Sequence, residues 1–167
     1  MLPRRRLHPS LQTLETRRLL SGPGTLDATF NGDGREMIDF SGLPGAGKTS
    51  GASAVLVQPD GKIVVAGDDL PGTIMGGGYP SSSLLLLTRL NADGSLDGTF
   101  GTGGKAAITL PAAATGDASV MRQADGKLVV VESTFSASTG NQTYVARLNA
   151  DGSPNLSFDS DGLVAIG

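Results

Sequence analysis

Short apolar runs, separated by polar and glycine-rich stretches, make up most of the chain. They are rich in Val, Ile and Leu and are bounded by Gly, Asp and Asn, which is typical of β-strands. No uninterrupted run is longer than Leu84–Leu87, which is far shorter than the roughly 20 residues that a membrane-spanning helix needs. The pattern therefore predicts an all-β fold without a membrane span. The expected strands lie at about 35–40, 53–58, 62–67, 83–90, 105–110, 118–123, 127–132, 141–148 and 162–166.

The strands are organised in a repeat. QPDGKIVVAG at 58–67 returns as QADGKLVVVE at 123–132. RLNADGSLDGTFGTGGK at 89–105 returns as RLNADGSPNLSFDSDGL at 147–163, and TLDATFNGDGR at 25–35 is an earlier, partial copy of its second half. A fixed period of this kind indicates a repeat architecture, in which each unit is one supersecondary structure.

We divide the chain according to this period, with four strands expected in each full repeat. The expected parts are a basic N-terminal sorting or disordered segment at 1–22, a first repeat at 23–95, a second repeat at 96–153 and the start of a third, truncated repeat at 154–167.

The turns within each repeat have clear conformational requirements. In QPDGK, Pro59 presets φ for the first central position of a type I turn, and Gly61 supplies the left-handed residue. The NADG segments at 91–94 and 149–152 follow the same logic, with the Asn side chain capping the turn.

One aromatic position recurs in all three copies. Phe30, Phe100 and Phe158 occupy it, and they are three of only five Phe residues. Because an aromatic side chain buries a large apolar area, we expect these residues to be core anchors where one blade meets the next.

LDGTFGTGGK at 96–105, QPDGKIVVAG at 58–67 and RLNADGS at 89–95 resemble the delta-60 repeat, a bacterial repeat. The three motifs recur in order, and the resemblance covers about residues 25–167. It implies repeated four-stranded antiparallel blades in an incomplete β-propeller-like array. It implies no catalytic residues, because the family is defined by its scaffold.

The chain departs from the delta-60 pattern in two ways. Its loops at 41–52 and 68–82 are long, and Pro154 and Asn155 replace Leu96 and Asp97 in the last copy. A closed propeller takes about four to eight blades, whereas two blades and one strand are predicted here. The chain is therefore a fragment of a larger product, or assembles with other chains, or forms a small open pair of sheets. Exposed strand edges would favour self-association.

The segment RRRLHPSLQTLETRRLLSG at 4–22 has no apolar core of the kind found in a secretory signal peptide. It resembles the LEPR-xLL type of N-terminal segment on large exported proteins of planctomycete-like bacteria. The matching residues are Leu14, Glu15, Arg17, Arg18, Leu19, Leu20 and Ser21, with Thr16 in place of Pro. The resemblance implies an extracellular or cell-surface location. The alternative is a short amphipathic helix or a disordered basic tail.

Charge is distributed unevenly. Five of the 13 Lys and Arg residues, but only one of the 16 Asp and Glu residues, lie within residues 1–21. The remainder of the chain is therefore acidic, and an acidic surface repels phosphate backbones, so we expect no nucleic-acid partner. The chain has no Cys, which excludes disulfides, thiolate metal sites and Cys nucleophiles.

The string SGLPGAGKTS at 41–50 fits the phosphate-binding loop pattern through Gly42, Gly47, Lys48 and Thr49. That chemistry needs a helix directly after the loop, so that the helix N-terminus faces the phosphates. The repeat alignment instead predicts a strand at 53–58. Nucleotide binding through 42–49 is therefore kept as a remote alternative to a lengthened loop.

Other site chemistry has weak support. The turns NGDG at 31–34 and DSDG at 159–162 carry carboxylates that suit Ca²⁺, but the equivalent GTGG at 101–104 has none. We expect Asp27 and Asp97 to bond local backbone N–H groups instead. His8 is the only His and lies in the N-terminal segment, so a Ser-His-Asp arrangement has no base.

These observations predict a non-enzymatic extracellular or cell-surface repeat protein with a scaffold or adhesion role and protein or cell-surface partners. A ligand-binding module for glycan or calcium is the alternative. We assign no catalytic, cofactor-binding or metal-binding residue and no cofactor.

Overall fold

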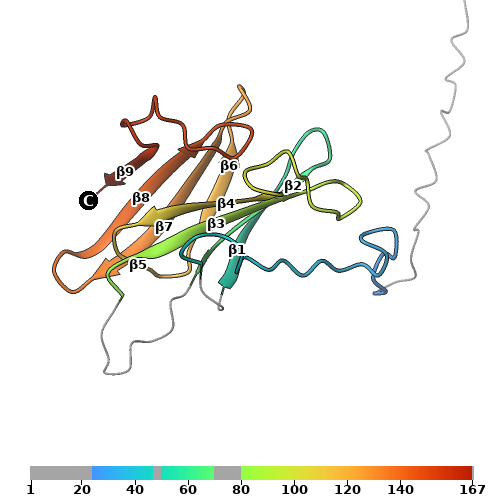
Figure 1. The fold of residues 1–167 in the computed structure, drawn as a ribbon, viewed down its shortest axis with the longest axis horizontal. Helices are drawn as coiled ribbons and strands as arrows, with labels where there is room; N and C mark the ends of the chain where they lie inside the picture. The colour runs from blue at the N-terminus through green and yellow to red at the C-terminus, as the bar shows by residue number, and fades with distance from the viewer. Residues whose placement is uncertain (1–23, 47–49, 70–79, 167) are drawn as a thin grey trace, which may run out of the picture.

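A computed structural model describes residues 24–46, 50–69 and 80–166. These residues form two antiparallel sheets and no helix (Figure 1). The first sheet has the order β1-β2-β3-β4, and in the second sheet β5 and β6 both pair with β7, followed by β8 and β9. The strands are β1 (Ser50–Val57), β2 (Ile63–Asp69), β3 (Ser83–Leu90), β4 (Lys105–Leu110), β5 (Ala113–Ala114), β6 (Ser119–Arg122), β7 (Leu128–Ser136), β8 (Gly140–Leu148) and β9 (Leu163–Ile166).

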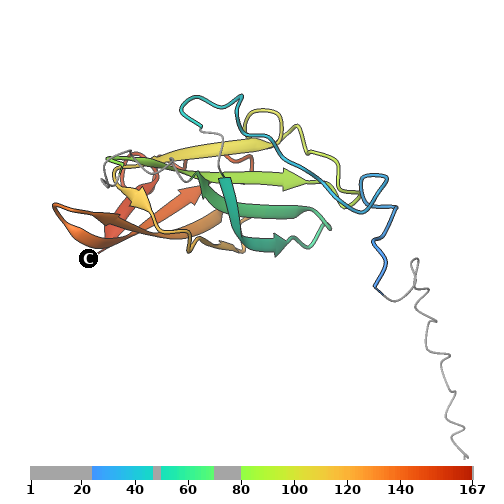
Figure 2. The ribbon, with the colours of Figure 1, turned by 90° about the horizontal axis from the view of Figure 1, so that it is seen from below.

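The two sheets pack face to face and share one hydrophobic core. Figure 2 shows β3 and β4, in green and yellow, lying over the orange strands of the second sheet. Side chains alternate along β7, with every second one buried, because successive residues of a strand point to opposite faces. The core joins Val64, Ala66, Leu85, Leu87 and Leu110 of the first sheet to Leu128, Val130, Ala146 and Leu148 of the second.

The all-β prediction is confirmed, and eight of the nine expected segments contain a strand. The prediction of a strand at 35–40 is wrong, because this segment is extended but pairs with no other strand in the described part of the chain. The short strand β5 was not expected. The residues at 35–40 therefore have the composition of a strand, but no neighbouring strand forms backbone hydrogen bonds with them.

The sheets are offset from the sequence repeats by one strand. We expected 105–110 to begin the second group of four strands, but β4 completes the first sheet by pairing with β3 from Ser83↔Leu110 to Thr88↔Lys105. Similarly, β9 completes the second sheet beside β8 instead of starting a new one. The first sheet therefore contains three strands of one sequence unit, β1–β3, and the second contains four strands of the next, β5–β8, and each sheet ends with an outer strand from the following copy.

The predicted turns are confirmed. Gly61 and Gly126 have φ values of +83° and +89°, in the left-handed region that favours glycine. Their N–H groups donate to the carbonyls of Gln58 and Gln123 at 2.9 and 3.0 Å. In the NADG turn at 91–94, the Asn91 side chain donates to Ser95 Oγ at 3.0 Å, as its expected capping role requires.

Candidate functional site

We now count a repeat from its QPDGK or QADGK turn to its aromatic residue, so that the first spans 58–100 and the second 123–158. These two repeats meet at a junction between an aromatic side chain and a turn. Phe100 is fully buried and lies against Gly152 in the Asn149–Gly152 turn of the next repeat. A side chain at Gly152 would place its Cβ 2.8 Å from the Phe100 ring, so only glycine fits there. Next to the ring, the Gly101 N–H donates to the Asp151 carbonyl at 2.6 Å. We call this arrangement the closed junction.

The same arrangement occurs one copy earlier. Phe30 packs on Gly94 of the Asn91–Gly94 turn, where a Cβ would lie 2.9 Å from the ring. The Asn31 N–H donates to the Asp93 carbonyl at 2.6 Å. The prediction of a core anchor between the sheets is therefore confirmed for Phe100, which is part of the shared core. It is wrong for Phe30 and Phe158, which are only partly buried, although Phe30 makes the equivalent contact with a turn.

The third aromatic, Phe158, has the same local structure but no following turn among the described residues. Asp159, directly after it, has φ of +51°, matching +49° at Asn31 and +52° at Gly101. This left-handed conformation is unusual for a residue other than glycine. Phe158 is only partly buried. We call Arg147, Phe158 and Asp159 the open junction half.

An arginine lies over the aromatic ring in both full repeats. The guanidinium of Arg89 is 4.8 Å from the Phe100 ring centre, and that of Arg147 is 4.6 Å from the Phe158 ring centre. These distances allow a favourable cation–π interaction. In the closed junction, Arg89 also donates from Nη1 to the carbonyl of Ala150 in the next repeat at 2.5 Å. Arg147 Nη1 has no such acceptor within the described residues.

A buried carboxylate fixes Arg89. Asp97 Oδ2 lies 2.6 Å from Arg89 Nε and 2.6 Å from Lys62 Nζ. Burial alone would raise the pKa of Asp97, but hydrogen bonds from Lys62, Thr99 and Arg89 outweigh it and hold the pKa well below its usual range. Asp97 also accepts the Thr99 N–H at 3.1 Å. Asp27 accepts the Thr29 N–H at 3.0 Å in the same way, so the predicted local hydrogen bonds are confirmed.

In the second repeat an amide takes the place of this carboxylate. Asn155 Oδ1 accepts from Arg147 Nε and Nη2 at 3.1 and 2.9 Å. Lys127, the equivalent of Lys62, lies 2.5 Å from Asp125 of its own turn instead. The stacking geometry is therefore kept while the buried ion pairs are lost.

Two buried carboxyl groups lie at the interface of the sheets. Glu132 on β7 is fully buried and Asp68 on β2 is 2% exposed. Both Glu132 oxygens and Asp68 Oδ2 have no hydrogen-bond partner within the described residues. Burial, and secondarily the charge of Asp68, raise the pKa of Glu132 to about 7. The backbone N–H groups of residues 115–117 favour the charged carboxylate and offset part of this rise in pKa. Burial, followed by the charges of Asp69 and Asp117, also raises the pKa of Asp68.

Only part of the phosphate-loop string lies within the described residues. Gly42 lies in a turn, whereas Gly47, Lys48 and Thr49 lie outside the described residues. The first element described after the string is β1, a strand, where a phosphate loop requires a helix. The structure therefore agrees with the expected strand at 53–58.

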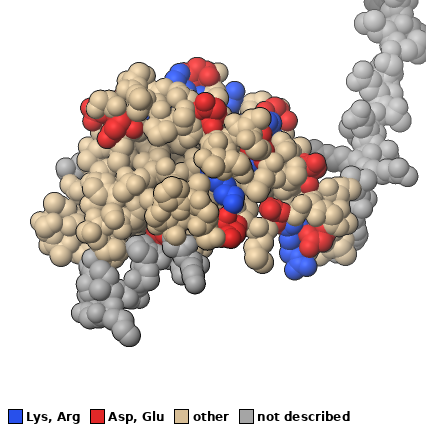
Figure 3. All heavy atoms as spheres, viewed as in Figure 1, with Lys and Arg blue, Asp and Glu red and all other residues tan. Residues whose placement is uncertain are grey.

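The acidic turns bond locally. Asp33 accepts the Arg35 N–H at 2.9 Å and Asp161 accepts the Leu163 N–H at 2.8 Å. Within the described ranges, no group of three or more His, Cys, Asp or Glu side chains is arranged to hold a metal ion, and no helix is long and apolar enough to cross a membrane. On the face seen in Figure 3, acidic and basic side chains are scattered over a largely uncharged surface.

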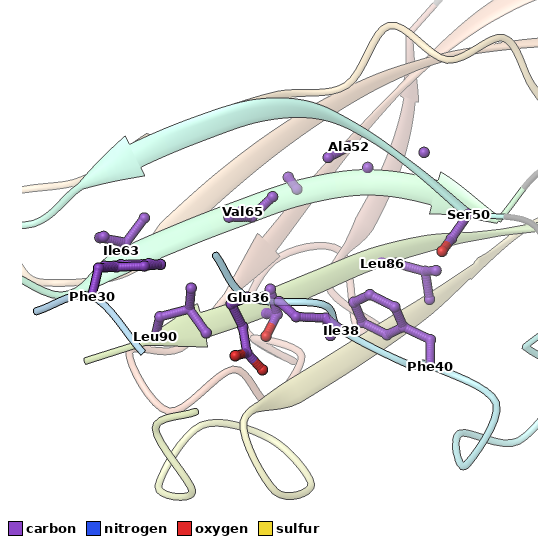
Figure 4. A pocket seen from close by; sticks show the side chains of 14 residues that line it. Phe30, Glu36, Ile38, Phe40, Ser50, Ala52, Ile63, Val65, Leu86 and Leu90 are labelled. Carbon is purple, nitrogen blue, oxygen red and sulfur yellow. The ribbon is translucent and has the colours of Figure 1, made fainter. Parts of the chain in front are cut away.

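A cavity of about 380 Å³ lies between the segment 30–40 and the first sheet. Figure 4 shows Ile38 and Phe40 on one side of it and Val65 and Leu86 on the other. The cavity is lined mainly by apolar side chains. One extended segment therefore covers this sheet face only in part.

Two stretches, residues 58–100 and 123–158, match the family model described as "Domain of unknown function (DUF5122) beta-propeller". They end at Phe100 and Phe158, the aromatic residues of the closed and open junctions. The match supports a propeller-type repeat family, in agreement with the antiparallel sheets. A search among curated proteins and a search among solved structures each found no match.

Sequence reasoning found the aromatic positions but missed their polar partners. Arg89 and Arg147 recur in the RLNADGS motif, and this recurrence was the available signal. Glu132 and Asp68 gave a weaker signal, as acidic residues at the ends of apolar runs.

Proposed function

We propose that this chain is a non-enzymatic repeat protein of the extracellular space or cell surface, with a scaffold or adhesion role. The observation that carries the proposal is the open junction half. Its aromatic ring, stacked arginine and left-handed backbone reproduce the half that binds a turn elsewhere in the same molecule.

The chemistry of this surface suits protein binding. Aromatic and arginine side chains are enriched at interfaces and provide much of their binding energy. Arg147 is held in place by Asn155 and Ser157, so little side-chain freedom is lost when a partner binds. Leu156 is not part of this surface, because it corresponds to Gly98 of the closed junction, where a side chain would meet open space. A partner that presents a backbone carbonyl next to a glycine, whose missing side chain leaves room for the ring, would complete the junction.

The proposed location is supported by the resemblance of segment 4–22 to an export-associated segment. It is tested by treating intact cells of the producing organism with a membrane-impermeant biotin reagent. We expect the protein in the labelled surface fraction or in the medium. Recovery in the cytosol alone would overturn the location.

The proposed role is tested by measuring how much purified full-length protein binds to the isolated cell-surface fraction. We expect Phe158→Ala to weaken this binding by about tenfold or more, which corresponds to about 1.4 kcal/mol. Leu156→Ala is the matched control, since it removes an exposed neighbouring side chain outside the ring stack. Equal binding by the wild type and both variants would exclude the open junction half as the binding surface.

A further inference from the structure

Each sheet has a second face that lies outside the shared core. The outer face of the first sheet presents Val55 and Val57, which are 67% and 65% exposed, beside Ile63 and Val65. The outer face of the second sheet presents Met121, which is 58% exposed, beside Val129. Both outer faces are largely apolar. The segment 30–46 covers the first of them in part, because Phe40, Leu43 and Ala46 pack with Leu84 and Leu86 and a cavity lies beside them.

The two outer faces match the two faces that already pack together. By repeat alignment, the positions of the first sheet's outer face correspond to buried or partly buried residues on the inner face of the second sheet. These pairs are Val55 with Val120, Ile63 with Leu128, and Val65 with Val130.

The correspondence also holds in the other direction. Met121, Val129 and Val131 on the outer face of the second sheet align with Leu56, Val64 and Ala66 on the inner face of the first. The interface between the two sheets of one chain therefore joins two different kinds of face. The outer face of the first sheet is of the same kind as the inner face of the second, and the outer face of the second is of the same kind as the inner face of the first.

We propose that copies of this chain associate head to tail. The outer face of the second sheet of one copy packs on the outer face of the first sheet of the next copy, as the inner faces pack within one chain. The Phe158 ring of the first copy then lies on the Asn91–Gly94 turn of the next, and Arg147 Nη1 donates to the Ala92 carbonyl, as Arg89 donates to Ala150. This inference rests on the proposed interaction role and names its partner.

The segment 30–40 competes with the incoming copy. Phe30 occupies the same Asn91–Gly94 turn that Phe158 would bind, and Ile38 and Phe40 line the cavity on the face that the second copy would cover. The segment pairs with no strand and Met37 is 93% exposed, but Phe40 packs with Leu84 and Leu86, so an incoming copy has to displace it. Removing the Phe30 ring should therefore favour association, whereas removing the Phe158 ring should oppose it.

Head-to-tail contacts use two different surfaces, so they generate a ring if the rotation closes and an open array otherwise. Propellers close with about four to eight blades. Two sheets from each copy would reach that number with about two to four copies.

Sedimentation velocity of the full chain tests the direction of each effect. We expect reversible association up to about 100 μM, with Phe30→Ala lowering the dissociation constant by about tenfold and Phe158→Ala raising it by about tenfold. Leu156→Ala should leave it unchanged. A wild-type chain that stays monomeric overturns the inference, as do Phe variants that shift the constant in the same direction. Far-UV circular dichroism checks that each variant is folded.

A mixing experiment tests the polarity of the contact. Val57→Asp blocks the outer face of the first sheet and Met121→Asp blocks that of the second, and both residues are exposed, so folding should be preserved. Each variant alone should be monomeric. Their equimolar mixture should form a heterodimer and nothing larger, because one usable pair of faces remains.

The mixture also separates this inference from the proposed function. No heterodimer, or association of either variant alone, overturns the head-to-tail contact. A monomer that still binds the cell-surface fraction through Phe158 would leave the proposed function intact.

Discussion

Phe100 and Phe158 have the same sequence context and the same local backbone, but their environments differ. An arginine stacks on each ring at nearly the same distance, and a left-handed residue follows each ring. Phe100 is nevertheless fully buried, whereas Phe158 is only partly buried. The turn at Gly152 lies on Phe100, whereas no such turn lies on Phe158 among the described residues. Phe30 has such a turn but is also only partly buried. The motif therefore sets the shape of the junction, and full burial needs the core of the two sheets, in which Phe100 lies, as well as the turn.

The two repeats also differ in charge at equivalent positions. Asp97 neutralises Arg89 and Lys62 in the first repeat, whereas the neutral amide of Asn155 supports Arg147 in the second. At another equivalent pair, Gly67 of the first repeat corresponds to the buried Glu132 of the second. Substitutions at such equivalent positions separate the effect of the residue type on stability from the effect of its surroundings.

The largest expected effect concerns the aromatic pair. Phe100→Ala should lower the free energy of unfolding by about 3–5 kcal/mol, because it removes a fully buried ring. Phe158→Ala should lower it by less than about 1 kcal/mol in the monomer, since that ring is partly in water already. Urea denaturation of both variants measures the difference. Equal losses would mean that the following turn does not determine burial energy.

The ion pairs should give the next largest effect. Asp97→Asn installs the amide of the second repeat in the first, where Lys62 and Arg89 would then lack a counter-charge. We expect a loss of about 2–3 kcal/mol in denaturant unfolding at neutral pH. The reciprocal variant, Asn155→Asp, should cost far less, and a loss as large as that of Asp97→Asn would contradict the asymmetry.

The buried Glu132 predicts a dependence of stability on pH. Its folded-state pKa is raised to about 7 by burial and by the charge of Asp68, so the native state holds a proton that the unfolded chain releases near pH 4.5. Stability should therefore fall as the pH rises from about 4.5 to 7 and then level off. Glu132→Gln should reduce this decline and raise the free energy of unfolding at pH 8 by an amount on the order of 2 kcal/mol.

This prediction is measured by urea denaturation at a series of pH values. Asp125→Asn, at an exposed turn carboxylate of the same repeat, is the control. An unchanged pH profile in Glu132→Gln would show that the carboxyl does not titrate in this range.

The smallest effect should come from the hairpin turns. Ala124 occupies the position that Pro59 has in the first repeat. Ala124→Pro should raise the free energy of unfolding by about 0.4–1 kcal/mol, because proline restricts the unfolded chain and its φ suits the first central position of a type I turn. Thermal unfolding compared with the reverse change, Pro59→Ala, measures this. A destabilised Ala124→Pro would show that the two turns differ in conformation.

Much of the fold could be predicted from the sequence, because runs such as 62–67 and 83–90 combine strand-forming residues with clear turn signals. The segment 35–40 shows the limit of that reasoning. Its pattern indicates strand propensity, but a strand also needs a neighbouring edge, and no local pattern specifies one. The offset of β4 from its own sequence unit has the same cause, since pairing with β3 is a contact between repeats.

The candidate site was predictable only in its aromatic part. Phe100 stood out because its aromatic position recurs in three copies and the chain has only five Phe residues. Arg89 gave no sign of burial, because a charged residue at the end of a strand is ordinarily solvated. Its burial depends on Asp97 and on Ala150 of the next repeat, and a distance between such segments is not encoded in any local motif.

The one-strand offset between sheets and sequence units has a consequence for how this chain can be cut or extended. Removing residues 96–153 as a unit would take β4 from the first sheet and leave only β9 of the second, so both sheets would be damaged. A cut between Leu110 and Ala113 would instead keep the four strands of the first sheet on one side and all strands of the second on the other. In this architecture the unit that duplicates in a gene and the unit that folds are different segments, and each added repeat is bound to the previous one by a shared sheet.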